Sequence, residues 1–262
     1  MCRLLGYLGS AIQLDRILLK PEHSLVVQSY QPQQMTAGLL NADGFGIGWY
    51  GEPENPPYAY KNVLPIWNDA NLPQLGRYIK SSCYLGYVRS ATSNLSVDII
   101  NCQPFLHQNL LFVHNGFIDN FRKTLYRPIR NELDDFAYQR IEGTTDSEHI
   151  FALIVNEFET NHDISLQQAL GHTIARLIKL AHTDKIAFSA NIILSNGKEL
   201  AASRYSNREA SPTLYYIKDH HFLTDGVLIA SEPMFKGEWI SCPEASIIGV
   251  GENLEVSVNS IS

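Results

Sequence analysis

The sequence has 262 residues, of which 45% are hydrophobic and 18% charged, the balance of a folded globular protein rather than a disordered one. Its net charge of -7 and its pI near 5.7 argue against a surface that binds nucleic acid or an anionic membrane. No apolar run reaches the roughly 20 residues that span a bilayer, and charged residues interrupt the N-terminal segment, so neither a membrane anchor nor a signal peptide is predicted. We therefore expect a cytoplasmic protein.

Short apolar segments bounded by Gly, Asn or Pro predict strands in the first half of the chain at residues 2–8, 45–50, 83–88 and 110–113. A helix is predicted over residues 13–19. Two longer helices follow over 147–158 and 166–181, because apolar side chains recur there at helical spacing and Thr144, Thr145 and Asp146 are available as caps. Further strands are predicted at 186–194, 199–205, 213–217, 227–231, 246–250 and 254–258.

Strands, then two helices, then strands again is an α+β pattern with mostly antiparallel sheets. The Asn196-Gly197 pair between two of the strands predicts a hairpin with a type I′ turn, in which both residues have positive φ. The glycines of residues 41–48 predict close packing beside the first strand. No linker divides the chain, so we expect one domain over residues 2–262.

Cys2 stands apart from the other cysteines by its position. The four are widely scattered without a CxxC pair, so neither a zinc site nor a disulfide framework is predicted. A small second residue favours removal of Met1, which leaves a thiol and an α-amine on one residue. Because the free amine has a pKa near ~7.7–8.0, it can accept the thiol proton at neutral pH. Taken alone, a Met-Cys start is usually incidental.

Three stretches support a chemical role for Cys2. Arg89 ends a strand before a loop of small residues, where its guanidinium can grip a carboxylate with two hydrogen bonds. Asn115 and Gly116 offer a side-chain amide and a backbone N–H for an oxyanion hole. Asp146, at the start of a predicted helix, can bind an ammonium group. Singly, each has an ordinary alternative: a surface salt bridge, a turn and a helix cap.

The order of these motifs resembles that of the class II glutamine amidotransferases, which use an N-terminal cysteine nucleophile. The likeness spans about residues 2 to 200 and is densest at Cys2-Arg3-Leu4, residues 41–46, residues 89–92 and His114-Asn115-Gly116. It implies the four-layer αββα sandwich of the N-terminal-nucleophile hydrolases.

The resemblance also implies a role for each site residue. Cys2 would be the nucleophile, with its own α-amine as base and acid. Arg89 and Thr92 would hold the α-carboxylate of the substrate, and Asp146 its α-ammonium group. Asn115 and Gly116 would form the oxyanion hole. Neither a cofactor nor a metal is implied, and the histidines of the predicted helices show no HxxxH or HExxH spacing.

The chain is most similar to the stand-alone branch of the family that serves ergothioneine synthesis, through residues 1–9, 40–50, 202–205 and 230–233. That branch hydrolyses the γ-glutamyl amide of γ-glutamyl-hercynylcysteine sulfoxide. The implied partner is thus this small molecule, with only transient contacts to other enzymes of the pathway. Arg204 or Glu232 is a candidate contact for the leaving half. An aromatic face could bind its trimethylammonium group, with candidates Trp49, Tyr50, Tyr205 and Trp239, although core packing is the commoner role of such residues.

Two alternatives stay open. A hydrolase of glutathione or glutamine that works with a partner subunit shares the same Cys, Arg and Asn-Gly signals. A non-catalytic scaffold with this fold is the other, but it gives no reason to keep Cys2, Arg89, Asn115, Gly116 and Asp146 together.

Overall fold

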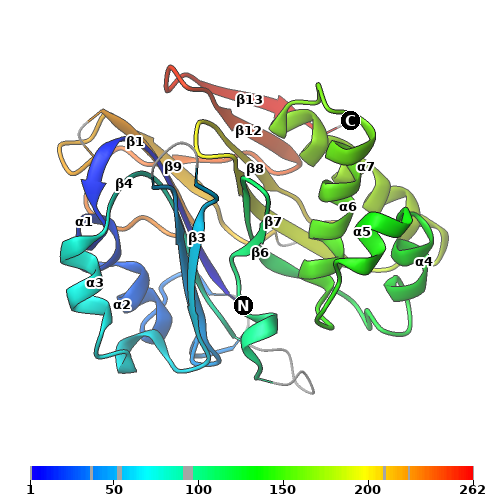
Figure 1. The fold of residues 1–262 in the computed structure, drawn as a ribbon, viewed down its shortest axis with the longest axis horizontal. Helices are drawn as coiled ribbons and strands as arrows, with labels where there is room; N and C mark the ends of the chain where they lie inside the picture. The colour runs from blue at the N-terminus through cyan, green and yellow to red at the C-terminus, as the bar shows by residue number, and fades with distance from the viewer. Residues whose placement is uncertain are drawn as a thin grey trace.

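The computed structural model describes residues 2–35, 38–51, 55–90, 97–208, 211–223 and 225–261. Two β-sheets stack face to face, and each has helices on its outer side (Figure 1). The N-terminal end of the chain lies between the two sheets at one end of the stack.

The first sheet has seven strands in the order β11-β9-β10-β1-β4-β2-β3. All of its pairings are antiparallel, and β1 lies near its centre between β10 and β4. Its strands are β1 (Arg3–Gln13), β2 (Phe45–Trp49), β3 (Tyr58–Asn62), β4 (Lys80–Val88), β9 (Tyr215–Lys218), β10 (Gly226–Ala230) and β11 (Ile240–Ser241).

The second sheet has six strands in the order β13-β12-β8-β7-β6-β5, again all antiparallel. Its strands are β5 (Phe105–His107), β6 (Leu110–Ile118), β7 (Phe188–Ser195), β8 (Leu200–Arg204), β12 (Ser246–Val250) and β13 (Val256–Ser260). Each sheet contains strands from both the first and the second half of the chain.

Two groups of helices cover the outer faces. The first sheet is covered by α1 (Asp15–Leu18), α2 (Leu25–Tyr30) and α3 (Leu72–Tyr78). The second is covered by α4 (Tyr126–Asn131), α5 (Asp135–Gln139), α6 (Asp146–Thr160) and α7 (Leu166–Thr183). Two short 3₁₀ helices, η1 (Ile66–Asn68) and η2 (Ile99–Asn101), lie in loops.

Three apolar cores separate the four layers. Alternate residues of a strand face opposite sides of the sheet, so Leu4 and Leu8 of β1 face the second sheet while Leu5 and Tyr7 face α1–α3. On the far side, Phe112 of β6 belongs to the core beneath α6 and α7. This arrangement confirms the predicted α+β class and the four-layer sandwich.

Two local predictions need correction. The hairpin between β7 and β8 forms, but only Gly197 has positive φ (+89°) while Asn196 does not, so the turn is not type I′. Asn196 instead accepts main-chain hydrogen bonds from Lys198 and Glu199, which favours a longer loop.

The glycines of residues 41–48 do not pack beside the first strand as predicted. Strand β2 is not beside β1, because β4 lies between them. Its Gly46 packs against the carbonyl oxygen of Gln103, where a Cβ would collide.

In the part of the chain that the structure describes, no helix combines the length and apolarity needed to cross a bilayer.

Candidate active site

Cys2 lies immediately before β1 and is only partly exposed. Its Sγ is 3.0 Å from the hydroxyl oxygen of Tyr87. The backbone N–H of Ser90 donates to the same sulfur at 3.4 Å, and the thiol can donate to the Ser90 carbonyl at 3.7 Å. Among the four cysteines it is the one that is not buried.

The end of β4 places Tyr87, Arg89 and Ser90 around the same cavity as Cys2. Arg3 of β1 pairs with Val88 of β4, so the residues that follow Val88 run beside the N-terminus. Arg89 is 3% exposed, and its Nη1 donates to the Asp43 carbonyl at 3.4 Å. Main-chain bonds between Arg89 and residues 43–44 hold it against the loop before β2. The segment of residues 41–46 thus supports Arg89.

Strand β6 supplies Asn115 and Gly116. Asn115 is 1% exposed, and its side-chain Nδ2 has no hydrogen-bond partner among the residues that the structure describes. An unpaired buried donor is uncommon and costly, which makes this amide a fitting donor for a developing oxyanion. Gly116 is required by close packing, because a Cβ there would collide with the carbonyl oxygen of Ser189 on β7.

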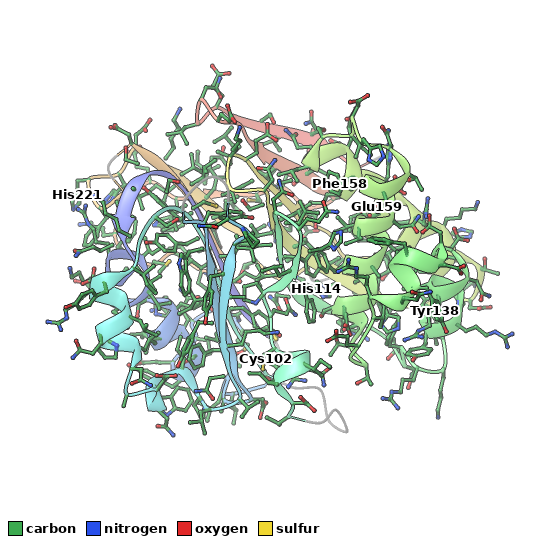
Figure 2. All side chains as sticks on the ribbon, in the orientation of Figure 1. Cys102, His114, Tyr138, Phe158, Glu159 and His221 are labelled. Carbon is green, nitrogen blue, oxygen red and sulfur yellow. The ribbon has the colours of Figure 1, made fainter. Side chains whose placement is uncertain are left out.

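His114 belongs to β6, and its side chain points from the strand toward the helices that cover the second sheet (Figure 2). Its Nδ1 is 2.8 Å from the Ser147 hydroxyl, and its Nε2 is 3.3 Å from the Ser189 carbonyl. Burial lowers the pKa of His114, and the charge of Asp146 opposes this only in part, so the imidazole is neutral at pH 7.

Helix α6 begins with Asp146, but Thr145 is its cap: the Thr145 side chain accepts from the backbone N–H of Glu148. Asp146 Oδ2 accepts from the Ile118 N–H at 2.9 Å and Oδ1 from the Ser147 N–H at 2.8 Å. These bonds fix the carboxylate between α6 and the end of β6. Thr145, and not Asp146, is therefore the capping residue of this helix.

A small cavity of about 40 Å³ joins these elements. Of the predicted site residues, it brings together Cys2, Arg89, Gly116 and Asp146. Asn115 is not on its wall, although His114 and Gly116 on either side of it are. Thr92 lies outside the described residues.

Arg3 holds the main chain of Cys2. Its Nη1 donates to the carbonyl of Cys2 at 2.9 Å, and its Nε lies 2.9 Å from Glu232 Oε1. Glu232 also accepts from His23 and from the backbone N–H groups of Gln33 and Gln34. Burial alone would raise the pKa of Glu232, but these bonds and the charge of Arg3 together lower it, so the carboxylate stays ionised.

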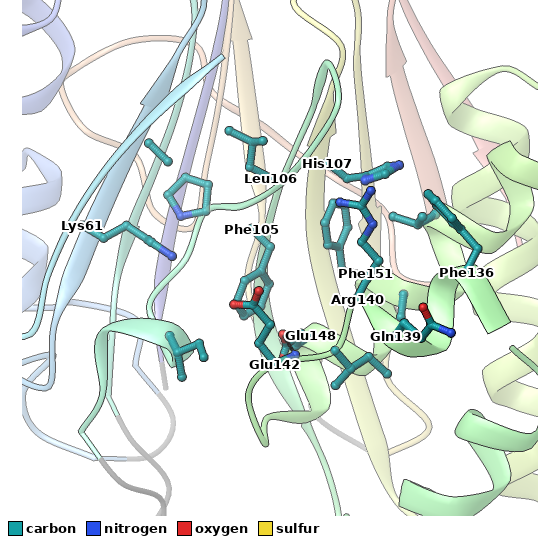
Figure 3. Close-up of a pocket in the computed structure, with 16 residues that line it drawn as sticks. Lys61, Phe105, Leu106, His107, Phe136, Gln139, Arg140, Glu142, Glu148 and Phe151 are labelled. Carbon is teal, nitrogen blue, oxygen red and sulfur yellow. Dashed lines mark hydrogen bonds between the residues drawn. The ribbon is translucent and has the colours of Figure 1, made fainter. Parts of the chain in front are cut away.

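A larger cavity of about 560 Å³ lies beside this site (Figure 3). Lys61 reaches into it from β3, while Arg140 and Glu142 enter it from the segment that follows α5. Both cavities are lined by residues of the same two segments, 100–104 and 142–148. None of the predicted site residues that the structure describes lines the larger one.

Several residues considered in the sequence serve the fold instead. Arg204 donates to the carbonyls of Pro212 and Cys242, and Glu232 binds Arg3. Trp49, Tyr50, Tyr205 and Trp239 do not line the described wall of the Cys2 cavity and pack against the apolar cores.

Burial raises the pKa of the Cys83 and Cys242 thiols to about 12, so both are unreactive near neutral pH. Groups of Cys, His, Asp and Glu able to hold a metal are not found among the described residues.

Sequence reasoning missed four residues on the cavity wall: Tyr87, Asn101, Gln103 and Ser147. Tyr87 resembles any apolar strand residue. Gln103 exchanges two hydrogen bonds with the main chain of His114, a pairing that only the fold reveals. Ser147 was assigned only to a helix, and its contact with His114 depends on the packing of α6 on β6.

Comparison with known proteins places the chain in a family. The family profile described as "Glutamine amidotransferases class-II" matches residues 1–230. The gamma-glutamyl-hercynylcysteine sulfoxide hydrolase of Mycolicibacterium smegmatis is 32% identical, over 95% of this chain and 96% of that protein. The probable glutamine amidotransferase DUG3 of Saccharomyces cerevisiae is 29% identical, over 95% of this chain and 82% of that protein.

A solved structure supports the fold. The glutamine aminotransferase class-II domain protein from Silicibacter pomeroyi superposes with a TM-score of 0.72 at 24% identity, and the match covers 100% of both chains. With the family profile and the hydrolase relatives, the conclusion is direct: this chain is a member of the class II glutamine amidotransferases, and it is an amidohydrolase.

Proposed function

We propose that this protein hydrolyses a γ-glutamyl amide, with Cys2 as its N-terminal nucleophile after removal of Met1. One observation carries the proposal: the same small cavity is lined by the thiol residue, by a buried arginine and by a fixed carboxylate, namely Cys2, Arg89 and Asp146. These are the groups needed to hold an amino acid by its two charged ends and to attack its side chain.

The glutamyl half of the substrate is bound first. The guanidinium of Arg89 takes the α-carboxylate through two parallel hydrogen bonds, a geometry that a lysine does not provide. Asp146 takes the α-ammonium group, because its carboxylate is held in place by backbone donors of Ile118 and Ser147. Thr92 is proposed to assist Arg89.

The α-amine of Cys2 then takes the thiol proton, and the thiolate attacks the γ-carbonyl carbon. Asn115 Nδ2 and the Gly116 N–H stabilise the oxyanion. The C–N bond breaks as the ammonium returns its proton to the leaving amine, which leaves a thioester on Cys2. Water, deprotonated by the same α-amine, attacks the thioester; glutamate and the free thiol are released.

We propose γ-glutamyl-hercynylcysteine sulfoxide as the substrate, and hence a place in ergothioneine biosynthesis. Support comes from the 32% identity to a hydrolase named for that compound, over nearly the whole of both chains. Residues 2–262 are proposed to act as one catalytic domain, because Leu4 and Ile248 from opposite ends of the chain share the core between the sheets.

A second candidate follows from the similarity to the yeast amidotransferase. In this alternative the same Cys2 site hydrolyses glutathione or glutamine, together with a partner subunit. The chemistry at the glutamyl half is identical, and only the leaving group differs.

The test is glutamate release by protein whose loss of Met1 has been verified by intact mass. The three substrates are γ-glutamyl-hercynylcysteine sulfoxide, glutathione and glutamine, with Cys2→Ala as the inactive control. The proposal predicts the highest kcat/KM with the first substrate. Preference for glutathione or glutamine would support the second candidate, whereas equal glutamate release by Cys2→Ala would refute both.

A further inference from the structure

The hydroxyl of Tyr87 lies 3.0 Å from the Cys2 sulfur and has no other hydrogen-bond partner in the described part of the chain. Tyr87 is opposite Leu4 in the β1–β4 register, and its side chain belongs to the core between the two sheets. From there its ring reaches along the sheet to the end of β1. A buried tyrosine hydroxyl ordinarily bonds a carbonyl, as Tyr84 does with Ile12 at 2.7 Å on the opposite face of β4.

Two donors therefore converge on the sulfur. The N–H of Ser90 approaches it at 3.4 Å, and Tyr87 supplies the second donor. In the thiol form, the S–H proton is directed toward the Ser90 carbonyl at 3.7 Å. Once that proton has moved to the α-amine, the negative sulfur can accept from both donors, and hydrogen bonds to a charged acceptor are stronger than those to a neutral one.

The Tyr87 hydroxyl is suited to donate a hydrogen bond and not to lose its proton. Its side chain is 3% exposed, and burial, together with the nearby thiol group of Cys2, raises the pKa of its hydroxyl well above the ordinary value of 10. The hydroxyl therefore keeps its proton near neutral pH. It supplies a hydrogen bond, while the proton itself travels between the thiol and the α-amine.

We propose that Tyr87 is a catalytic residue whose hydroxyl, with the Ser90 N–H, holds the Cys2 sulfur as a hydrogen-bonded thiolate. The inference rests on the proposed function, which makes Cys2 the nucleophile. The contact acts twice. It stabilises the thiolate formed before attack, and it stabilises the sulfur when the C–S bond of the thioester breaks and that electron pair returns to it. The α-ammonium then returns the proton to sulfur.

The test measures the thiol without any substrate. The rate of Cys2 alkylation by iodoacetamide is followed against pH by peptide mass spectrometry in wild type, Tyr87→Phe and Tyr84→Phe. Tyr84→Phe is the matched control, because it removes a buried hydroxyl from the same strand but not from the sulfur. The other charged or titratable groups around the site are unchanged in all three proteins: the Cys2 amine, Arg3, Arg89, Cys102, His114 and Asp146.

Loss of one bond to the thiolate is expected to raise the midpoint of the Tyr87→Phe profile by roughly one to two pH units, with kcat reduced about 10- to 100-fold and KM little changed. Tyr84→Phe should keep the wild-type midpoint. Fluorotyrosine at position 87, a stronger donor of the same shape, should lower the midpoint, which separates donation from packing. Equal midpoints in wild type and Tyr87→Phe would overturn the inference while leaving Cys2 as the nucleophile; if Cys2→Ala were also fully active, the proposed function itself would fail.

Discussion

Arg3 and Glu232 form an ion pair that is buried on both sides, with 2.9 Å between Nε and Oε1 and side-chain exposures of 0% and 1%. The two residues are far apart in sequence and meet because β1 pairs with β10. Since Arg3 also holds the carbonyl of Cys2, the pair links the stability of the fold to the position of Cys2.

Removing one partner of this pair should strongly lower the free energy of unfolding. Glu232→Gln leaves the buried Arg3 guanidinium without its counter-charge, so we expect a loss of about 3–5 kcal/mol in the free energy of unfolding, measured by urea denaturation. Glu244→Gln is the control. It removes an exposed carboxylate 3.5 Å from Arg204 and should cost no more than about 1 kcal/mol. Similar small losses in both variants would show that the buried pair is not structural.

Arg89→Lys should impair substrate binding although it keeps the charge. The lysine ammonium offers no planar fork for the α-carboxylate, so kcat/KM should fall about 10- to 100-fold, mainly through KM. Arg204→Lys changes an arginine that donates to the Pro212 and Cys242 carbonyls, and we expect its KM to match wild type. Steady-state kinetics on the two variants decides the matter; an unchanged kcat/KM in Arg89→Lys would remove that residue from the site.

Asn115→Ala should lower kcat without destabilising the fold. Its Nδ2 has no hydrogen-bond partner among the described residues, so truncation breaks no internal bond of that group. Loss of one oxyanion donor predicts a drop in kcat of about 10²–10³ with KM little changed. In contrast, Asn191→Ala, directly opposite on β7, removes bonds to the Pro212 and Thr213 carbonyls and should reduce Tm more than kcat. The reverse pattern would contradict the oxyanion role.

Stability should decline in acid because of His149. Burial, together with the charge of Arg130, lowers the pKa of this residue to about 4, although the hydrogen bond from its Nδ1–H to the Thr145 carbonyl acts in the opposite direction. The unfolded chain protonates near pH 6.5 and the folded one only near 4. The stability due to the neutral imidazole is therefore complete above about pH 6.5 and is lost as the pH falls toward 4, by about 3 kcal/mol.

The check is urea unfolding between pH 4 and 7. His149→Asn keeps a donor toward Thr145 and should show a shallower decline than wild type. His182→Asn alters an exposed histidine and should keep the wild-type slope. If His149→Asn retained the full decline, the acid sensitivity would have to come from other groups.

The sequence predicted the elements whose pattern is local. The spacing of Ile150, Ile154 and Phe158 defined α6 to within two residues at its C-terminus, and the short apolar segments located most strands. Helix α2, with six residues and its Ser24 cap, is too short to show a period. The type I′ prediction at Asn196 was wrong because side-chain bonding within the loop determined the turn.

A residue of the candidate site could be predicted only where its type suits the chemistry and its place at the end of a strand or the start of a helix is visible in the sequence. Arg89 and Asp146 were identified by residue type beside a strand end and a helix start. The contact of Tyr87 with Cys2 and that of Glu232 with Arg3 could not be predicted, because they depend on the registers of β1 with β4 and β10. No local pattern distinguishes a core tyrosine from one whose hydroxyl reaches the Cys2 sulfur.

The proposed mechanism requires that the Cys2 thiol is acylated, with its own free α-amine as the base. The most direct measurement is acid-quench mass spectrometry of the N-terminal peptide during turnover, with Met1-processed protein compared with protein that retains Met1. We expect one glutamyl group on Cys2 in the processed protein and none when Met1 is present. Turnover without any glutamyl adduct at Cys2, or equal turnover by the Met1-retaining protein, would contradict it.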